Sequence, residues 1–256
     1  MPKPLKVLAF DTSTDRLSVA VTDGARVWQH SGPGGAQASA TLIPTILALL
    51  AEAGLGLGEL DAIVFGRGPG SFTGLRTACA VAQGLAFGAN HGAGIPVLPV
   101  DTLMAVAEEA RFQQAGAMAG GGELLHITAL LDARMDEMYV QRYQFQGGLY
   151  TSLNECALIR PENLAPGTAA QQLLAGNVFS VYAGRLPAEL SALRCVEALP
   201  TATALLRLAP ALAAAGQCID PALALPLYVR DKVAQTTDER ARIKAEALLA
   251  ATAVSP

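Results

Sequence analysis

The chain has few of the residues from which metal and redox sites are built. Its 256 residues include four scattered cysteines and three histidines. No C-x-x-C pair and no H-x-x-x-H or H-E-x-x-H pair occurs, so the ligand spacings of common zinc sites are missing. We therefore predict no metal centre, and we expect the cysteines to be reduced and structural.

Charged side chains are also scarce, at 16% of the residues against 52% hydrophobic ones. The formal net charge is −4, so the sequence has no basic stripe of the kind that binds nucleic acid unaided. Residues 77–100 contain no Asp, Glu, Lys or Arg, yet glycines and prolines interrupt this stretch too often for a transmembrane helix. Because no secretory signal opens the sequence, we predict a cytoplasmic protein that does not associate with membranes.

The two halves of the chain follow the same plan. Each begins with an apolar strand that ends at an aspartate, Asp11 or Asp132, and continues into an alternating strand. The segments that carry this pattern are 5–10 and 17–21 in the first half, and 125–131 and 138–143 in the second. Internal similarity of this kind predicts two related α/β lobes, although two such halves can also resemble each other by chance.

A glycine-rich segment, Gly66 to Arg76, follows a short apolar run and precedes a helical pattern. Four glycines and one proline between residues 66 and 74 exclude a helix interior, so the segment predicts a tight strand-to-helix turn. The backbone of such a turn comes close to a phosphate, a substrate or another stretch of backbone. The segment is neither a Walker A motif nor G-x-G-x-x-G, because no G-K-[ST] closes it and its glycines are spaced differently.

Asp11 and the hydroxyl-rich residues after it allow two interpretations. Hydroxyls and amides in such a hairpin can bind a phosphate. Together with two glycines of the glycine-rich segment, this makes the candidate nucleotide-binding residues Asp11, Thr12, Ser13, Gly68 and Gly70. Alternatively, Asp11 caps its own turn by accepting hydrogen bonds from nearby amides. The second half has Arg134 in the corresponding turn and no glycine-rich phosphate hairpin, which argues against ATP hydrolysis by the chain alone.

Ser71 and Thr73 are the hydroxyl residues of the glycine-rich segment. No G-x-S-x-G elbow surrounds them, which argues against a peptidase. Thr73 is a better candidate for the N-cap of the following helix. We therefore predict no catalytic residue in this chain.

Two predicted helices, over 38–53 and 73–89, are apolar on more than one side. In the first, Ile43, Ile46, Leu47 and Leu50 follow the i, i+3, i+4, i+7 pattern, and Leu42 and Leu49 widen the stripe. The second carries small residues, which allow another helix to approach closely. Because such helices need cover on a second side, we predict a partner face formed by Leu42, Ile46, Leu49, Leu75, Arg76, Cys79, Ala80, Ala82 and Gln83.

Five segments together carry a resemblance to a known family. They are Phe10-Asp11-Thr12-Ser13-Thr14, Gly66-Arg67-Gly68-Pro69-Gly70-Ser71-Phe72-Thr73-Gly74-Leu75-Arg76, Ala82-Gln83-Gly84-Leu85-Ala86, Asp132-Ala133-Arg134 and Pro226-Leu227-Tyr228-Val229-Arg230. They resemble the bacterial TsaB (YeaZ) family over residues 5 to about 233, with the glycine-rich run as the most specific segment. One departure is Ala38, where many members carry histidine, so a role of that histidine does not carry over.

The resemblance implies an actin-like ATPase (ASKHA) fold, an α/β fold of two ribonuclease-H-like lobes with mixed sheets flanked by helices. We expect the first lobe, with the partner face, to comprise residues 1–104 and about 205–233. The second, degenerate lobe is expected over 105–204, and a mobile tail over 234–256.

The resemblance also implies a function and partners. Members of this family are non-catalytic subunits required to make N6-threonylcarbamoyladenosine at adenosine 37 of tRNAs that read codons beginning with A. They form a heterodimer with TsaD, which the ATPase TsaE joins, and they meet tRNA only through this complex. No tightly bound cofactor is implied, and weak nucleotide binding and a homodimer of the isolated chain are left open. The alternative is an ASKHA-type ATP-dependent small-molecule kinase.

Overall fold

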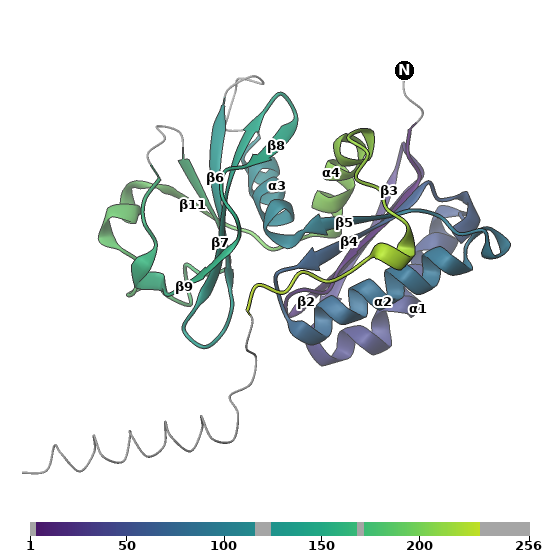
Figure 1. Ribbon diagram of the computed structural model, residues 1–256, viewed down its shortest axis with the longest axis horizontal. Coiled ribbons are helices and arrows are strands. Elements are labelled where there is room, and N and C mark those ends of the chain that lie inside the picture. The colour runs from purple at the N-terminus through teal and green to yellow at the C-terminus, as the bar shows by residue number, and fades with distance from the viewer. Residues whose placement is uncertain (1–3, 116–123, 168–171, 231–256) are drawn as a thin grey trace, which may run out of the picture.

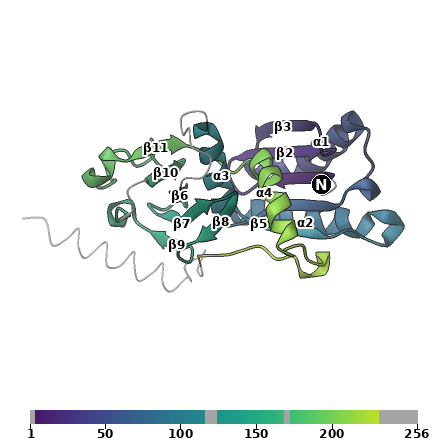
Figure 2. The ribbon, with the colours of Figure 1, turned by 90° about the horizontal axis from the view of Figure 1, so that it is seen from above.

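The computed structural model describes residues 4–115, 124–167 and 172–230, and the predicted tail over 234–256 lies outside them. Two mixed β-sheets lie side by side, and long helices cover the faces of the first sheet and separate it from the second (Figure 1). A view from above shows α3 and α4 between the two sheets (Figure 2). The molecule therefore has two α/β lobes, as the sequence predicted.

The first sheet has the strand order β3-β2-β1-β4-β5. Its strands are β1 (Val7–Asp11), β2 (Arg16–Thr22), β3 (Val27–Pro33), β4 (Ala62–Gly68) and β5 (Val97–Asp101). β2 runs antiparallel to β1 and β3, whereas β4 runs parallel to β1 and β5. The parallel connections pass through helices, as parallel strands require.

Side chains of the first sheet alternate between two helical layers. Leu8 and Phe10 pack against α1 (Ala38–Ala53) and α2 (Phe72–Gly88) on one face. Val7 and Ala9 point the other way, into a cluster with α4 (Ala202–Ala214). Because successive strand residues face opposite sides, an uninterrupted apolar run is what a strand covered on both faces needs.

The second sheet repeats this topology with the order β11-β10-β6-β7-β8. Its strands are β6 (Leu125–Asp132), β7 (Met138–Gln146), β8 (Leu149–Ser152), β10 (Gln172–Gly176) and β11 (Arg194–Glu197), and β9 (Ala157–Ile159) also pairs with β7. β7 runs antiparallel to β6 and β8, whereas β10 runs parallel to β6 and β11. The predicted internal repeat is confirmed, because both sheets share one strand order and one set of directions.

Helices and loops cover the second sheet unequally. α3 (Thr102–Gln114) packs through Leu103 and Val106 on one face, beside Ile127 of β6. On the other face, loop residues such as Tyr182 join the cluster of Leu130 and Met138. Short 3-10 helices among the described residues are η1 (Gly35–Gln37), η2 (Leu57–Glu59), η3 (Asn90–Gly92), η4 (Pro161–Asn163), η5 (Ala188–Ala192) and η6 (Pro221–Leu223).

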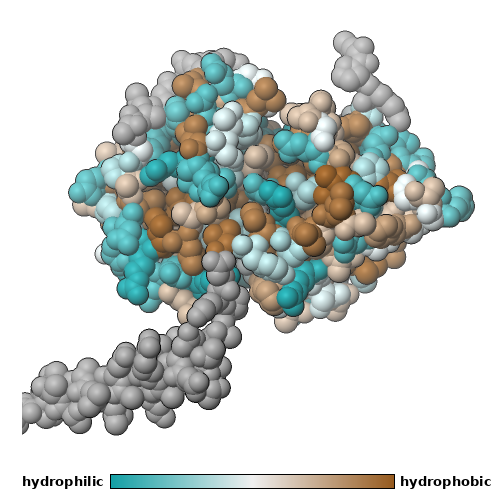
Figure 3. Space-filling view, in the orientation of Figure 1, coloured by the Kyte–Doolittle hydropathy of each residue, from teal (hydrophilic) through white to brown (hydrophobic). Residues whose placement is uncertain are grey.

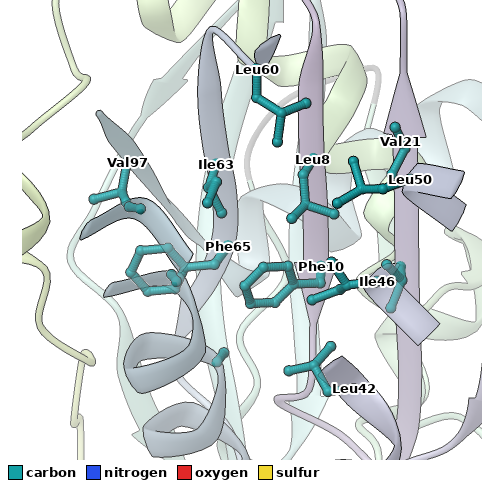
Figure 4. Close-up of a cluster of buried hydrophobic side chains, with 14 of the residues drawn as sticks. Leu8, Phe10, Val21, Leu42, Ile46, Leu50, Leu60, Ile63, Phe65 and Val97 are labelled. Carbon is teal, nitrogen blue, oxygen red and sulfur yellow. The ribbon is translucent and has the colours of Figure 1, made fainter. Parts of the chain in front are cut away.

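Helix α1 has the predicted bounds, and Gly54 ends it in the left-handed conformation that favours glycine. Its buried stripe differs from the prediction, because Leu42, Ile46, Leu49 and Leu50 face the sheet whereas Ile43 and Leu47 are 42% and 50% exposed. The close-up shows Leu42, Ile46 and Leu50 beside Leu8, Phe10 and Val21 (Figure 4). By length and composition Gly35–Ala53 could also span a membrane, but these contacts identify its inner side as part of a protein core.

A buried ionic cluster joins α3 to α4 at the contact between the lobes. Glu108 of α3, only 2% exposed, accepts hydrogen bonds from Arg111 Nε at 2.7 Å, Arg207 Nε at 2.8 Å and Tyr150 OH at 3.0 Å. Arg207 Nη2 also donates to Glu109 Oε2 at 2.6 Å. The carboxylate is therefore fully paired, which is the condition under which burial of a charge is tolerated.

We expect Glu108→Ala to lower the free energy of unfolding by about 3 kcal/mol, because it leaves two guanidinium groups and a tyrosine hydroxyl without their buried acceptor. Urea denaturation followed by circular dichroism measures this loss. The exposed Glu52→Ala on α1 is the control, with an expected change within ~0.5 kcal/mol. Equal effects of the two variants would show that the cluster does not stabilise the fold.

Candidate functional site

A cleft lies where the first strands of the two sheets end. Its volume is about 240 Å³, and the loops after β1, β4 and β6 form most of its walls. The lining residues are Ser13, Thr14, Asp15, Gly35, Gly70, Ser71, Leu131, Asp132, Ala133, Arg134, Tyr139 and Asn177. Equivalent loops of the two related lobes therefore face each other across this cleft.

Asp11 is a buried carboxylate at the end of β1. Its Oδ1 accepts hydrogen bonds from Ser13 N at 2.8 Å and from Ser13 Oγ at 2.6 Å. Burial raises the pKa of Asp11 to about 6, and the two bonds from Ser13 act in the opposite direction. Oδ2 has no hydrogen-bond partner among the described residues and lies against Gly66. The turn-capping interpretation of Asp11 is confirmed.

The glycine-rich loop comes close to the chain's own backbone. A Cβ on Gly66 would overlap the Asp11 carboxylate, and a Cβ on Gly70 or Gly74 would overlap the carbonyl of Ser13 or Thr12. These glycines are needed because only a residue without a side chain allows such close approach. The sequence left open whether this loop approaches a phosphate, a substrate or another stretch of backbone. The structure shows that it approaches backbone of the same chain.

Hydrogen bonds join the glycine-rich loop to the hairpin after β1. Ser71 N donates to Ser13 O at 2.7 Å, and Thr12 Oγ1 donates to Gly74 O at 2.7 Å. Ser13 already donates both its amide and its hydroxyl to Asp11. Three of the donors in this hairpin that could contact a phosphate, Thr12 Oγ1 and the amide and hydroxyl of Ser13, are therefore used within the protein.

The candidate nucleotide-binding residues occupy different places. Ser13 and Gly70 line the cleft, whereas Asp11 and Thr12 are buried behind its wall. Gly68, with a φ of 123°, faces away from the cleft toward the carbonyl of Leu227. Three of the five candidate nucleotide-binding residues therefore do not line this cleft, and their role in binding a nucleotide stays a prediction.

The second lobe has a similar turn with different local chemistry. Asp132 Oδ1 accepts from Arg134 N at 2.9 Å, as Asp11 does from Ser13, and also from Tyr182 OH at 2.7 Å. Arg134, Met135 and Asp136 all have φ values near +60°. Left-handed residues with side chains cost about 1–2 kcal/mol each, so the surrounding contacts must hold this turn in place.

Helix α2 begins one residue earlier than predicted, at Phe72. Ser71 occupies the N-cap position and makes no capping bond through its side chain. The prediction of Thr73 as N-cap is wrong, because Thr73 lies within the first turn and its carbonyl accepts from Thr77 Oγ1 at 3.0 Å.

Most of the predicted partner face belongs to the protein's own core. Six of its residues are buried between the helices and the first sheet: Leu42, Ile46, Leu49, Leu75, Cys79 and Ala82. The prediction for these residues is therefore corrected. Arg76 and Ala80 are exposed, and Gln83 is half-buried. The sequence pattern therefore assigned to a partner sides of these helices that pack on the protein's own sheet.

A C-terminal strap, residues 219–230, covers part of the remaining side of α2. Gln83 Nε2 donates to the carbonyls of Pro221 and Ala224 at 3.2 and 3.1 Å, and Cys79 Sγ donates to Ala224 O. Arg76 Nε donates to Tyr228 OH at 3.0 Å. Sequence analysis identified the end of this strap as a family signature, but periodicity gave no signal for its path.

The outward side of these helices is apolar and partly exposed. On α2 it consists of Thr73, Ala80, Gly84 and Phe87, which share one side of the helix between α1 and the strap. Ile43 and Leu47 extend it on α1, and exposed Leu223 and Leu225 border it on the strap. We call these eight residues the outer face. Apolar surface is visible among polar side chains on the strap side of the molecule (Figure 3).

Within the residues that the structure describes, no group of three or more His, Cys, Asp or Glu side chains is arranged to hold a metal ion. The cleft contains Asp15 and Asp132, together with Arg134, whose Nη1 lies 3.3 Å from Asp132 Oδ2. Arg134 therefore pairs with one of the two carboxylates that line the cleft.

Comparison with known proteins identifies the chain. A family model described as "TsaD: tRNA N6-adenosine threonylcarbamoyltransferase" matches residues 33–254. The "tRNA threonylcarbamoyladenosine biosynthesis protein TsaB" of Haemophilus influenzae is 36% identical over 184 residues, which is 70% of this chain and 72% of that protein. The protein of the same name from Escherichia coli K12 is 32% identical over 238 residues, or 90% and 96% of the two chains.

The chain belongs to the TsaB (YeaZ) family. A solved structure, "YeaZ from Pseudomonas aeruginosa", is 38% identical and superposes with a TM-score of 0.74 over 88% of this chain and 99% of that chain. Together with the TsaD family match, it confirms the ASKHA-type fold. In this TsaB family member, the glycine-rich run that carried the resemblance is the loop packed on the Asp11 hairpin.

Asp11→Asn should change how stability depends on pH. The folded chain holds a proton on Asp11 up to a pKa of about 6, whereas the unfolded chain releases it near 3.8. The folded state of the wild type therefore loses stability as pH rises between these values, and the uncharged asparagine removes this loss. We expect the variant to gain roughly 2–3 kcal/mol relative to wild type between pH 4 and pH 7.

Urea denaturation of both proteins at several pH values measures this difference. Other carboxylates contribute equally to both proteins, so subtraction isolates Asp11. A difference in stability that stays constant from pH 4 to pH 7 would contradict the raised pKa.

Proposed function

We propose that this chain is a non-catalytic scaffold subunit required to make N6-threonylcarbamoyladenosine at adenosine 37 of tRNAs that read codons beginning with A. It acts in the cytoplasm as the heterodimer partner of TsaD and helps to recruit the ATPase TsaE. Family membership supports the pathway, since relatives that match most of the chain are named for threonylcarbamoyladenosine biosynthesis. The outer face is the observation that carries the scaffold role.

The packing of the cleft supports a role without catalysis. In the loop and hairpin that meet there, Thr12 Oγ1, Ser13 Oγ and Ser71 N all donate hydrogen bonds within the protein, and Pro69 has no amide to offer. The only fully buried carboxylate at this end of β1, Asp11, is directed at Gly66 instead of into the cleft. A kinase would need such groups to face its substrate and its nucleotide.

The composition of α1 and α2 supports a docking role. Their 33 positions include one acidic and one basic residue, Glu52 and Arg76, so the outer face carries almost no charge to keep it in water. Ala80 and Gly84 are small, which allows a partner helix to approach the α2 backbone closely. Because the chain has a net charge of −4, contact with tRNA is expected to depend on the complex.

Two substitutions of alanine by glutamate test the docking face. Ala80→Glu places a charge on the exposed side of α2, so the variant should fold and bind TsaD at least tenfold more weakly, with a matching loss of modified tRNA in a reconstituted reaction. Ala82→Glu places the same charge in the core and should prevent folding. Circular dichroism and calorimetry measure folding and affinity.

The exposed Ala157→Glu on β9 is the matched control, since it adds the same charge to the other lobe. It should retain full affinity for TsaD. If Ala80→Glu binds TsaD as tightly as this control does, α2 is not the docking face. If wild-type chain is dispensable for modification in the reconstituted reaction, the scaffold function itself is wrong.

Calorimetry of the isolated chain with Mg-ATP separates the scaffold from the kinase alternative. Because Thr12 Oγ1 and both donors of Ser13 are already paired within the protein, we expect no binding in the micromolar range and no ATP turnover. Micromolar affinity, together with turnover that Asp11→Ala abolishes, would instead favour an ASKHA-type small-molecule kinase.

A further inference from the structure

The C-terminal strap connects the two lobes on the side of α2. Its first residue, Ile219, pairs with Val97 of β5, and Leu227 N donates to Arg67 O of β4 at 2.7 Å. Tyr228 packs on Phe72 at a ring distance of 5.2 Å. The strap then leaves the first lobe and reaches the loop after β6 in the second (Figure 1). One extended segment is thus attached to both lobes.

Arg230 forms the attachment to the second lobe. Its side chain is 15% exposed, and Nη2 lies 2.7 Å from Glu137 Oε2 and donates to the carbonyls of Ala133 and Arg134 at 3.2 and 3.4 Å. Nη1 lies 2.9 Å from Met135 Sδ. These contacts surround the left-handed turn that forms one wall of the cleft. Arg230 therefore attaches the strap to the second lobe and also holds this turn in place.

The Glu108 cluster connects the lobes on another side. Arg207 belongs to α4, which packs on the first sheet, whereas Glu108 belongs to α3, which packs on the second. Thr201 Oγ1 at the start of α4 adds a bond to Glu109 Oε2 at 2.7 Å. Arg207 is also stacked on Phe112 of α3 at 4.0 Å. Moving one lobe against the other would break several of these contacts at once.

We propose that the strap and the Glu108 cluster act as two clasps that hold the lobes at one fixed separation, so that the cleft neither opens nor closes. Each clasp joins the same two lobes at a different place, so a hinge motion about any axis that does not pass through both clasps breaks at least one of them. The inference rests on the proposed scaffold function and deepens it, because a partner that docks on the first lobe then meets the second lobe in a constant position.

The distance between the lobes tests this proposal directly. Nitroxide-bearing noncanonical amino acids at exposed Glu52 on α1 and Glu189 in η5 would report it by double electron–electron resonance, without altering the native cysteines. We expect the full chain to give one narrow distance distribution, which stays the same when Mg-ATP is added. Arg230→Met and Arg207→Met should each broaden it, and the double variant should broaden it most.

A matched variant and a second measurement make the test decisive. Arg194→Met removes an exposed arginine from β11 and should leave the distribution narrow. Hydrogen exchange of residues 132–137 should become roughly tenfold faster in Arg230→Met and stay unchanged in Arg194→Met. If Arg207→Met fails to fold, Arg230→Met decides the outcome.

A broad or two-peaked distribution in the full chain, or an Arg230→Met variant as narrow as Arg194→Met, would overturn the proposal. Neither measurement involves tRNA. A failure here therefore stays distinct from a failure of the scaffold function, which the reconstituted modification reaction detects.

Discussion

The contact between the glycine-rich loop and the Asp11 hairpin is the constraint on which much of the first lobe depends. Gly66, Gly70 and Gly74 bring two backbone segments closer than any side chain would allow. Because α2 starts within this loop, the contact also fixes which side of α2 packs on the sheet and which side faces out. A loop whose composition resembles a phosphate-binding turn thus serves to position helix α2.

The two lobes share a topology but stabilise their equivalent turns in different ways. After β1, small residues and backbone carbonyls complete the turn, and Asp11 is enclosed. After β6, residues with side chains adopt left-handed conformations, and contacts from Tyr182, Asn177 and Arg230 hold them. Both arrangements depend on distant residues, because Gly74 bonds to Thr12 from 62 positions away and Arg230 reaches the turn after β6 from up to 97 positions away.

Local patterns predicted the strands and helices well, including the repeat of β1 and β2 in β6 and β7. The predicted buried stripe of α1 included Ile43 and Leu47, which are exposed, whereas Leu42 and Leu49 are buried. All four residues are apolar, and periodicity cannot choose between two apolar sides of a helix. The strap and the Glu108 cluster had no local signal, because their partners are far apart in sequence. For the same reason, sequence alone could not show that Thr12 and Asp11 lie behind the cleft wall.

The ambiguity of α1 and α2 has a physical meaning. A helix that packs on its own sheet and also receives a partner must be apolar on two sides, and such a helix gives no periodic signal for either. In the structure, Leu42, Ile46 and Ala82 are buried against the protein's own core, whereas Ile43, Leu47 and Ala80 are exposed. The strap separates polar from apolar groups in the same way. Its backbone carbonyls accept hydrogen bonds from Gln83, whereas its side chains Leu223 and Leu225 are exposed. Helices α1 and α2 are held by their packing on the first sheet, and the strap is held by its hydrogen bonds to α2. The outer face that they form can therefore be apolar without weakening the fold of the isolated chain.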